Sequence, residues 1–174
     1  INLPQDDRVK AYIPIQDLND EEFIKNNYIM FCTRQGTIKK TLVQDFSRPR
    51  SNGINAITIH EGDMLLEARL TNGNNEIIIA NRKGRAIRFN ESKVRSMGRN
   101  AAGVRGMTLV GPNDGVVGMV CVDPNDMLVT IFVVSEGGNG KRTALEDYRV
   151  TNRGGKGVKT MKITEKTGDL IAIK

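Results

Sequence analysis

The 174-residue sequence has no tryptophan, a single histidine, two cysteines and only five prolines. Its histidine, His60, has no group of cysteines or carboxylates at ligand spacing around it, which argues against a metal site. No apolar run approaches the roughly 20 residues that a membrane-spanning helix needs. Aromatic residues make up 5% of the chain, too few for a groove in which single-stranded bases stack on aromatic rings.

Motifs for catalysis are also missing. No nucleophile elbow is present. The stretch SEGGNGKRT departs from a phosphate-binding loop twice, because Ser135 replaces its first glycine and Arg142 replaces the Ser or Thr after its lysine. A propeller-type glycosidase needs facing carboxylates, whereas the acids here lie mostly in expected turns. We therefore predict no catalytic, cofactor-binding or metal-binding residues in this chain.

The two cysteines, Cys32 and Cys121, lie in apolar runs that are typical of strands. Disulfides are rare in cytosolic proteins, so we interpret both as reduced core residues. The chain shows no signal peptide and does not begin with methionine, so Ile1 is expected to be a cut end.

Glycine and β-branched residues are abundant instead. Eighteen glycines and frequent Val, Ile and Thr favour many short strands joined by tight turns, so the predicted fold class is all-β. Gly53, Gly103 and Gly157 lie 50 and 54 residues apart, each followed by a β-branched residue. Aspartates recur at a matching spacing, expected as turn residues ahead of the last strand of each unit: Asp63, Asp114 and Asp169.

A period of about 50 residues with four strands per unit predicts a propeller-like array. We divide one partial domain, 1–174, into the tail of a unit at 1–13 and three units at 28–70, 76–122 and 127–174. The third strand of each unit is expected to follow the repeated glycine, at 54–59, 104–109 and 158–163.

Positive charge is concentrated in three windows of a chain whose net charge is +6. Residues 36–54 carry +3, residues 82–105 carry +7 and residues 141–162 carry +5, so the remainder is acidic. If the units surround an axis, equivalent basic loops fall on one rim that can contact successive phosphates of a curved duplex. The alternative is a solvated positive face without a partner.

The predicted phosphate-contacting residues are the Lys and Arg side chains of these windows, as follows: Lys39, Lys40, Arg48, Arg50, Arg82, Lys83, Arg85, Arg88, Lys93, Arg95, Arg99, Arg105, Lys141, Arg142, Arg149, Arg153, Lys156 and Lys159.

Three segments resemble the C-terminal domain of the bacterial DNA gyrase A subunit, part of a type II topoisomerase: GTIKKT, NRKGRAIRFNESKVRSMGRNAAGVRGM and GKRTALEDYRVTNRGGKGVKTMKI. The resemblance covers essentially the whole chain. It implies a β-pinwheel, a propeller-like disc that normally has six four-stranded blades, of which about three and a half fit here. In that family the basic outer rim wraps duplex DNA with a right-handed sense, so that the enzyme introduces negative supercoils.

The resemblance also implies partners and cofactors. The parent is expected to use ATP and Mg²⁺ in the bacterial cytoplasm. It is expected to act on double-stranded DNA with the remainder of the gyrase A subunit, together with the gyrase B subunit. Neither a membrane nor a small-molecule substrate is expected. The family's DNA-facing positions map onto these residues: Arg85, Arg88, Arg95, Arg99, Arg105, Lys141, Arg142, Arg149, Arg153 and Lys156.

The chain departs from the family pattern at one motif. Residues 152–157, NRGGKG, are similar to the gyrase-defining box Gln-Arg-Arg-Gly-Gly-Lys-Gly, but that box belongs to the first blade, so we do not equate them. The family's DNA-cleaving tyrosine lies in its N-terminal region, and no tyrosine here is assigned that role. Three alternatives stay open: the C-terminal domain of the topoisomerase IV A subunit, a propeller used as a protein-interaction module and, third, a propeller enzyme.

Overall fold

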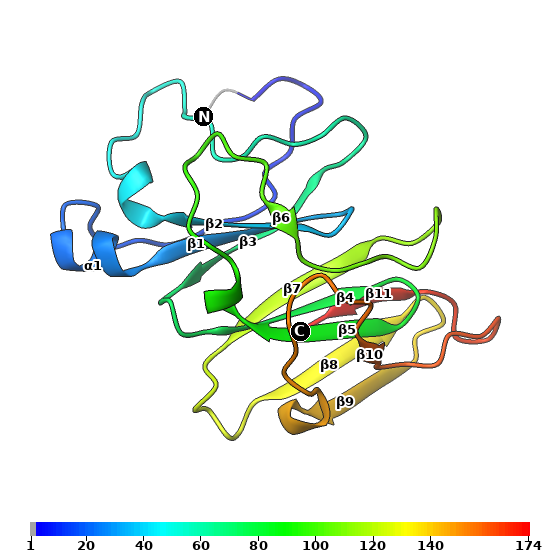
Figure 1. Ribbon diagram of the computed structural model, residues 1–174. Helices are drawn as coiled ribbons and strands as arrows, with labels where there is room; N and C mark the ends of the chain where they lie inside the picture. The colour runs from blue at the N-terminus through cyan, green and yellow to red at the C-terminus, as the bar shows by residue number, and fades with distance from the viewer. Residues whose placement is uncertain (1–2) are drawn as a thin grey trace.

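The computed structural model describes residues 3–174, so residues 1 and 2 of the predicted tail lie outside the described part. Nearly all of its regular structure is β, with three short 3₁₀ helices and one short α-helix (Figure 1). The elements are α1 (Glu21–Asn26), β1 (Tyr28–Thr33), β2 (Thr37–Leu42), η1 (Val43–Phe46), β3 (Leu65–Thr71), β4 (Glu76–Asn81), β5 (Arg85–Asn90), η2 (Glu91–Lys93), β6 (Val104–Arg105), β7 (Val116–Val122), β8 (Thr130–Ser135), β9 (Gly140–Ala144), η3 (Leu145–Asp147), β10 (Val158–Lys159) and β11 (Leu170–Ile173).

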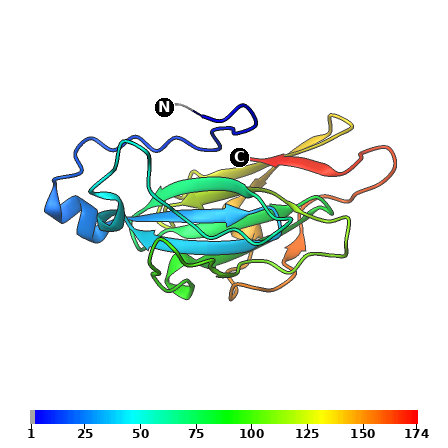
Figure 2. The same cartoon turned by 90° about the horizontal axis from the view of Figure 1, so that it is seen from above.

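These strands form three antiparallel sheets. The first sheet has the order β3-β1-β2-β6, the second has the order β10-β5-β4-β7, and the third has the order β11-β8-β9. The predicted all-β fold of repeated four-stranded units is confirmed, with three strands in the third sheet among residues 3–174. The edge strands β3, β7 and β11 lie on the side nearer the N-terminal segment, whereas the edge strand β10 lies on the opposite side (Figure 2).

The strand after the repeated glycine pairs with the preceding unit. β6 of the second unit pairs with β2, and β10 of the third unit pairs with β5. Residues 54–59 form no strand, and β6 and β10 have two residues each, so the expected six-residue strands are wrong. A β-segment needs a neighbouring edge, and in the described chain only the second and third units have a preceding unit to supply one.

The core lies between the sheets. Every residue of β4 is buried, because the second sheet is covered on both faces. Ile77 and Ile79 join a cluster with Met30 of the first sheet. Ile78 packs in a second cluster with Ile131 of the third sheet. The alternation of side chains along one strand therefore holds three sheets together.

Both cysteines are free, as predicted, and lie in or against the first of these clusters. Cys32 is fully buried, and its loss of contact with water raises the pKa of its thiol far above the ordinary value. Burial likewise raises the pKa of Cys121 to about 12. Both side chains thus act as small apolar groups in the core.

The repeated glycines adopt the left-handed conformation that their position predicts. The φ angles of Gly53, Gly103 and Gly157 are 80°, 108° and 71°. A Cβ on Gly157 would lie 2.3 Å from the carbonyl oxygen of Ala86 in β5, and one on Gly103 would lie 2.5 Å from that of Ile38 in β2. Glycine therefore lets the second and third units approach the backbone of the preceding unit, whereas Gly53 has open space around it.

We expect Gly157→Ala to lower the free energy of unfolding by about 2 kcal/mol, because it adds both backbone strain and a clash with Ala86. Gly98→Ala is the control. The φ angle of Gly98 is not positive, and a Cβ added there would meet no atom within 4 Å. Urea unfolding followed by circular dichroism measures the difference. Equal midpoints for the two variants would show that the close approach at Gly157 does not stabilise the fold.

Candidate nucleic-acid interface

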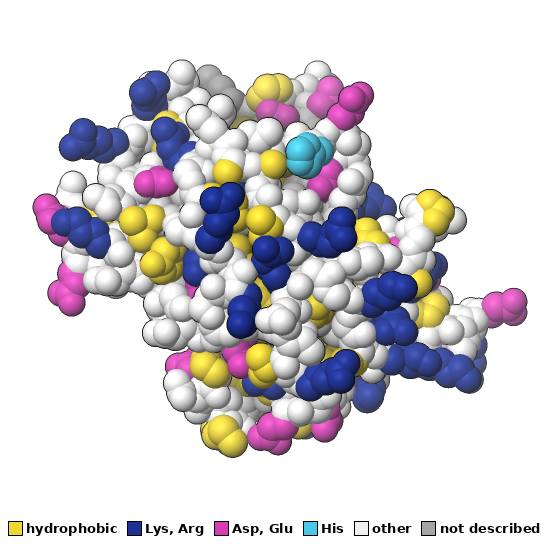
Figure 3. Space-filling model, in the orientation of Figure 1, with side chains coloured by type: hydrophobic (Ala, Val, Ile, Leu, Met, Phe, Trp, Pro, Cys, Tyr) yellow, Lys and Arg dark blue, Asp and Glu magenta, His cyan; other side chains and the backbone are white. Residues whose placement is uncertain are grey.

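A band of Lys and Arg side chains crosses the face seen in Figure 3. This face carries the outer side of the sheets, where the loops before β6 and β10 run (Figure 1). We call the exposed members of the predicted set the basic band: Arg48, Arg50, Lys93, Arg95, Arg105, Lys141, Arg142, Arg149, Lys156 and Lys159.

The basic loops of the second and third units are held at both ends along the edge of the preceding unit's second strand. The amide of Met97 donates to the carbonyl of Lys40 at 2.8 Å, and the amide of Gly106 donates to Gly36 at 2.8 Å. In the next unit the amide of Thr151 donates to Arg88 at 2.8 Å, and Thr160 donates to Gly84 at 2.9 Å. The same docking therefore occurs twice, so equivalent loops face the same way.

The prediction that Lys39 and Lys40 lie on the exposed rim is wrong. Lys39 is 0% exposed, and its ammonium donates to the carbonyls of Ala56 at 2.6 Å and Arg99 at 2.5 Å. Lys40 is also buried, and its ammonium donates to the carbonyl of Glu91 and lies 3.9 Å from the Glu91 carboxylate. Burial lowers the pKa of both lysines, and that of Lys39 falls to about 8.

Arg88 of β5 repeats the role of Lys40 rather than facing solvent. Its guanidinium donates to the carbonyls of Leu145 at 2.7 Å and Tyr148 at 3.0 Å, and it pairs with the buried carboxylate of Glu76. Leu145 begins η3 just as Glu91 begins η2. In both joints a cation of the preceding unit satisfies a carbonyl of the next 3₁₀ helix, so Arg88 is corrected to an internal residue.

Three further predicted residues are half-buried at the joint between the second and third units. Arg82 and Lys83 each lie 2.9 Å from the carboxylate of Asp169. Arg85 donates to the carbonyl of Gly157 at 2.9 Å. The hydrogen bond from Lys83 is the main cause that holds the pKa of Asp169 below its ordinary value. These three side chains therefore bind residues of the third unit and hold it against the second unit.

Arg99 and Arg153 are intermediate cases, because each guanidinium contacts backbone carbonyls of a neighbouring loop. Two residues that sequence reasoning missed, Thr58 and Thr108, contact the same loops. Their only signal in the sequence is that each lies five residues after a repeated glycine.

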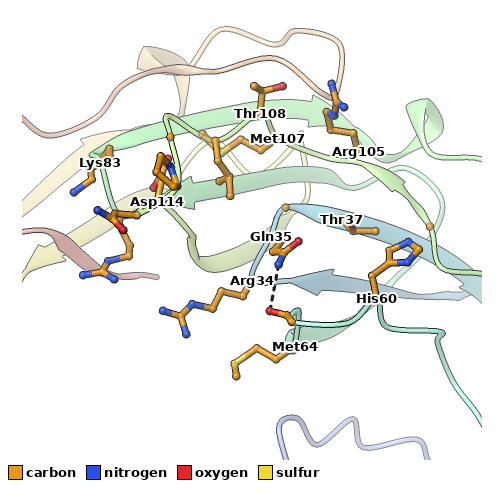
Figure 4. A pocket seen from close by; sticks show the side chains of 18 of the residues that line it. Arg34, Gln35, Thr37, His60, Met64, Lys83, Arg105, Met107, Thr108 and Asp114 are labelled. Carbon is orange, nitrogen blue, oxygen red and sulfur yellow. Dashed lines mark hydrogen bonds between the residues drawn. The ribbon is translucent and has the colours of Figure 1, made fainter.

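A polar cavity of about 1200 Å³ lies beside the turns of the first two units, with Arg34, Lys83, Arg105 and Asp114 in its lining (Figure 4). The three basic side chains point in different directions (Figure 4). His60 is a turn residue, as expected, and its carbonyl accepts from the amide of Asp63. Within residues 3–174 no group of three or more His, Cys, Asp or Glu could hold a metal ion.

The buried ammonium of Lys39 predicts a specific pH dependence. The ordinary pKa of lysine is 10.5, so between about pH 8 and 10.5 the unfolded chain holds a proton that the folded chain has released. Rising pH therefore stabilises the folded wild type relative to Lys39→Met. In urea unfolding at pH 7.5, 8.5 and 9.5, the free energy of unfolding of wild type should rise relative to that of Lys39→Met as the pH increases. A constant difference across this range would contradict the burial of a titrating amine.

Comparisons with known proteins agree with this arrangement. A family model described as "DNA gyrase C-terminal domain, beta-propeller" matches residues 27–72, 75–123 and 130–174. The DNA gyrase A subunit of Staphylococcus epidermidis is 42% identical over 174 residues, which is 99% of this chain and 19% of that relative. Its counterpart in Staphylococcus aureus is 41% identical over the same span, so the chain spans about a fifth of the length of these curated relatives.

Solved structures are similar as well. The C-terminal domain of DNA topoisomerase IV superposes with a TM-score of 0.86 at 27% identity, covering 99% of this chain and 51% of that one. A DNA gyrase A C-terminal domain has a TM-score of 0.75 at 27% identity, covering 87% of this chain and 50% of that one. None of the helices described here is long and apolar enough to cross a membrane. With the family model matching most of the chain, this protein belongs to the family of DNA gyrase A C-terminal domains.

Proposed function

We propose that this chain binds duplex DNA without sequence preference and bends or wraps it along its outer basic band. The observation that carries the proposal is the repeated docking of basic loops along one edge of the sheets. Loops held in the same orientation present Arg and Lys side chains at successive points of a curved path, as phosphates lie along a bent duplex.

The distribution of charge supports this partner. The exposed loops before β6 and β10 carry cations, whereas α1 and its N-cap carry three exposed acids, Asp20, Glu21 and Glu22. Such separation creates a field that attracts a polyanion to one face. Phosphate contacts of this kind carry no base information, and their affinity falls steeply as salt rises.

The parent protein is proposed to be the A subunit of a DNA gyrase, working in ATP- and Mg²⁺-dependent negative supercoiling. Its partners would be the remainder of that polypeptide together with the gyrase B subunit, in the bacterial cytoplasm. The chain supplies no catalytic group in this proposal. Its residues act only by holding DNA, and ATP and Mg²⁺ belong to other parts of the enzyme.

The second candidate is the C-terminal domain of a topoisomerase IV A subunit, favoured by the TM-score of 0.86 to such a domain. Both candidates predict duplex binding by the basic band, so the test between them is supercoiling by the parent protein. A third candidate, a module that binds an acidic protein, predicts no steep dependence of duplex affinity on salt.

The first test is binding of a random-sequence linear duplex by mobility shift, from low to physiological salt. We expect affinity to fall steeply with salt, with a slope of about 0.9 per phosphate neutralised, and to be equal for unrelated sequences. Absence of binding at low salt would overturn the proposal and favour the protein-binding module.

The second test reverses charge within the band. Arg95, Arg149 and Lys156 have exposed side chains, so changing all three to Glu should reduce duplex affinity more than about a hundredfold at low salt with little loss of stability. The control changes Arg8, Lys10 and Lys25 to Glu, which alters net charge equally outside the band. Equal losses in both variants would show that net charge, not the band, determines binding.

A further inference from the structure

The segment that follows Gly53 in the first unit is joined to the basic loop of the second unit by a set of hydrogen bonds. Thr58 donates its amide to the carbonyl of Ala101 at 3.2 Å and its hydroxyl to the carbonyl of Asn100 at 2.7 Å. In return, the guanidinium of Arg99 donates to the carbonyl of Asn55 at 3.3 Å. We call these contacts the first clasp.

The segment that follows Gly103 in the second unit is joined to the basic loop of the third unit in the same way. Thr108 donates its amide to the carbonyl of Gly155 at 2.9 Å and its hydroxyl to the carbonyl of Gly154 at 2.6 Å. The guanidinium of Arg153 donates through Nη1 to the carbonyl of Arg105 at 2.9 Å. We call these contacts the second clasp.

The two clasps occupy equivalent positions in the repeat. Each threonine lies five residues after a repeated glycine, Gly53 or Gly103. Each arginine lies four residues before the next repeated glycine, Gly103 or Gly157. Because the same donors and acceptors recur at the same offsets from the repeated glycines, the two sets of bonds belong to the repeat and are not a coincidence of loop geometry.

The second clasp reaches further into the basic band than the first. The Nε of Arg153 also donates to the carbonyl of Lys93 at 2.9 Å. One guanidinium therefore contacts the backbone of two exposed cationic residues, Lys93 and Arg105, from the neighbouring unit. Its planar fork of donors suits this double contact, whereas a lysine ammonium cannot reproduce the same geometry.

We propose that Arg99 and Arg153 are positioning residues that, with Thr58 and Thr108, fix the spacing between neighbouring basic loops. This inference rests on the proposed duplex binding, which would depend on that spacing. Both arginines were predicted as direct phosphate contacts. Their backbone bonds assign them a different task, in which they place the exposed cations of the loops, such as Lys93, along one path.

The two roles differ in what a charge-preserving change does. A direct phosphate contact is largely electrostatic, so Lys in place of Arg keeps most of the affinity. A clasp needs the donor fork, so Lys fails there although the net charge is unchanged. Thr108→Val separates the roles further, because it removes a hydroxyl bond and alters no charge.

The experiment compares Arg153→Lys and Thr108→Val with two matched controls outside the band, Arg8→Lys and Thr130→Val, whose side chains are exposed and make no hydrogen bond in the described residues. We expect Arg153→Lys to weaken duplex binding about tenfold and Thr108→Val about threefold, with the salt slope unchanged. Both controls should stay within twofold of wild type. Wild-type affinity in both clasp variants would overturn the proposal.

Hydrogen exchange without DNA tests the clasp separately from duplex binding. The amide of Thr108 should exchange at least tenfold faster in Arg153→Lys than in wild type, while core amides of β4 keep their protection. If wild type binds no duplex, the proposed function fails, and this exchange rate alone decides whether the clasp fixes the loops. Unchanged exchange at Thr108 would overturn the positioning role whatever the binding result.

Discussion

The hydrogen bonds between each unit's loop and the second strand of the preceding unit are the constraint on which the remaining structure depends. They set the short strands β6 and β10 at the sheet edges and require glycine where the two backbones approach. They also bring two cations, Lys40 and Arg88, against the carbonyls of the following 3₁₀ helices. The register in which each loop pairs with the preceding strand therefore determines the sheet edges, the positions that require glycine and the cations that become buried.

This register divides the basic residues into two groups with different physical environments. Lys39, Lys40 and Arg88, on the second strands of the first two units, lie under the loop of the next unit, so they are desolvated and satisfy carbonyl groups. Most loop cations, among them Arg95, Arg149 and Lys156, remain in water, where they are free to meet a polyanion. A high local density of Lys and Arg in the sequence thus combines internal and external roles that only the fold separates.

The sequence was sufficient to predict the all-β repeat, because glycine spacing and short apolar runs are local signals. It also located the basic loops correctly. It could not predict the burial of Lys39, whose partners Ala56 and Arg99 come from two different loops. Nor could it predict that β6 and β10 pair with the preceding unit. A two-residue strand has no periodicity, and its partner lies more than 60 residues away.

The clasps have a consequence for how the curvature of the outer face arises. Each clasp involves only two adjacent units, so the angle between their basic loops is set locally at that joint. A small error at one joint would displace every loop beyond it by an amount that grows with distance. A long, stiff polymer held along this face would sense that accumulated error more strongly than a short ligand held at one loop.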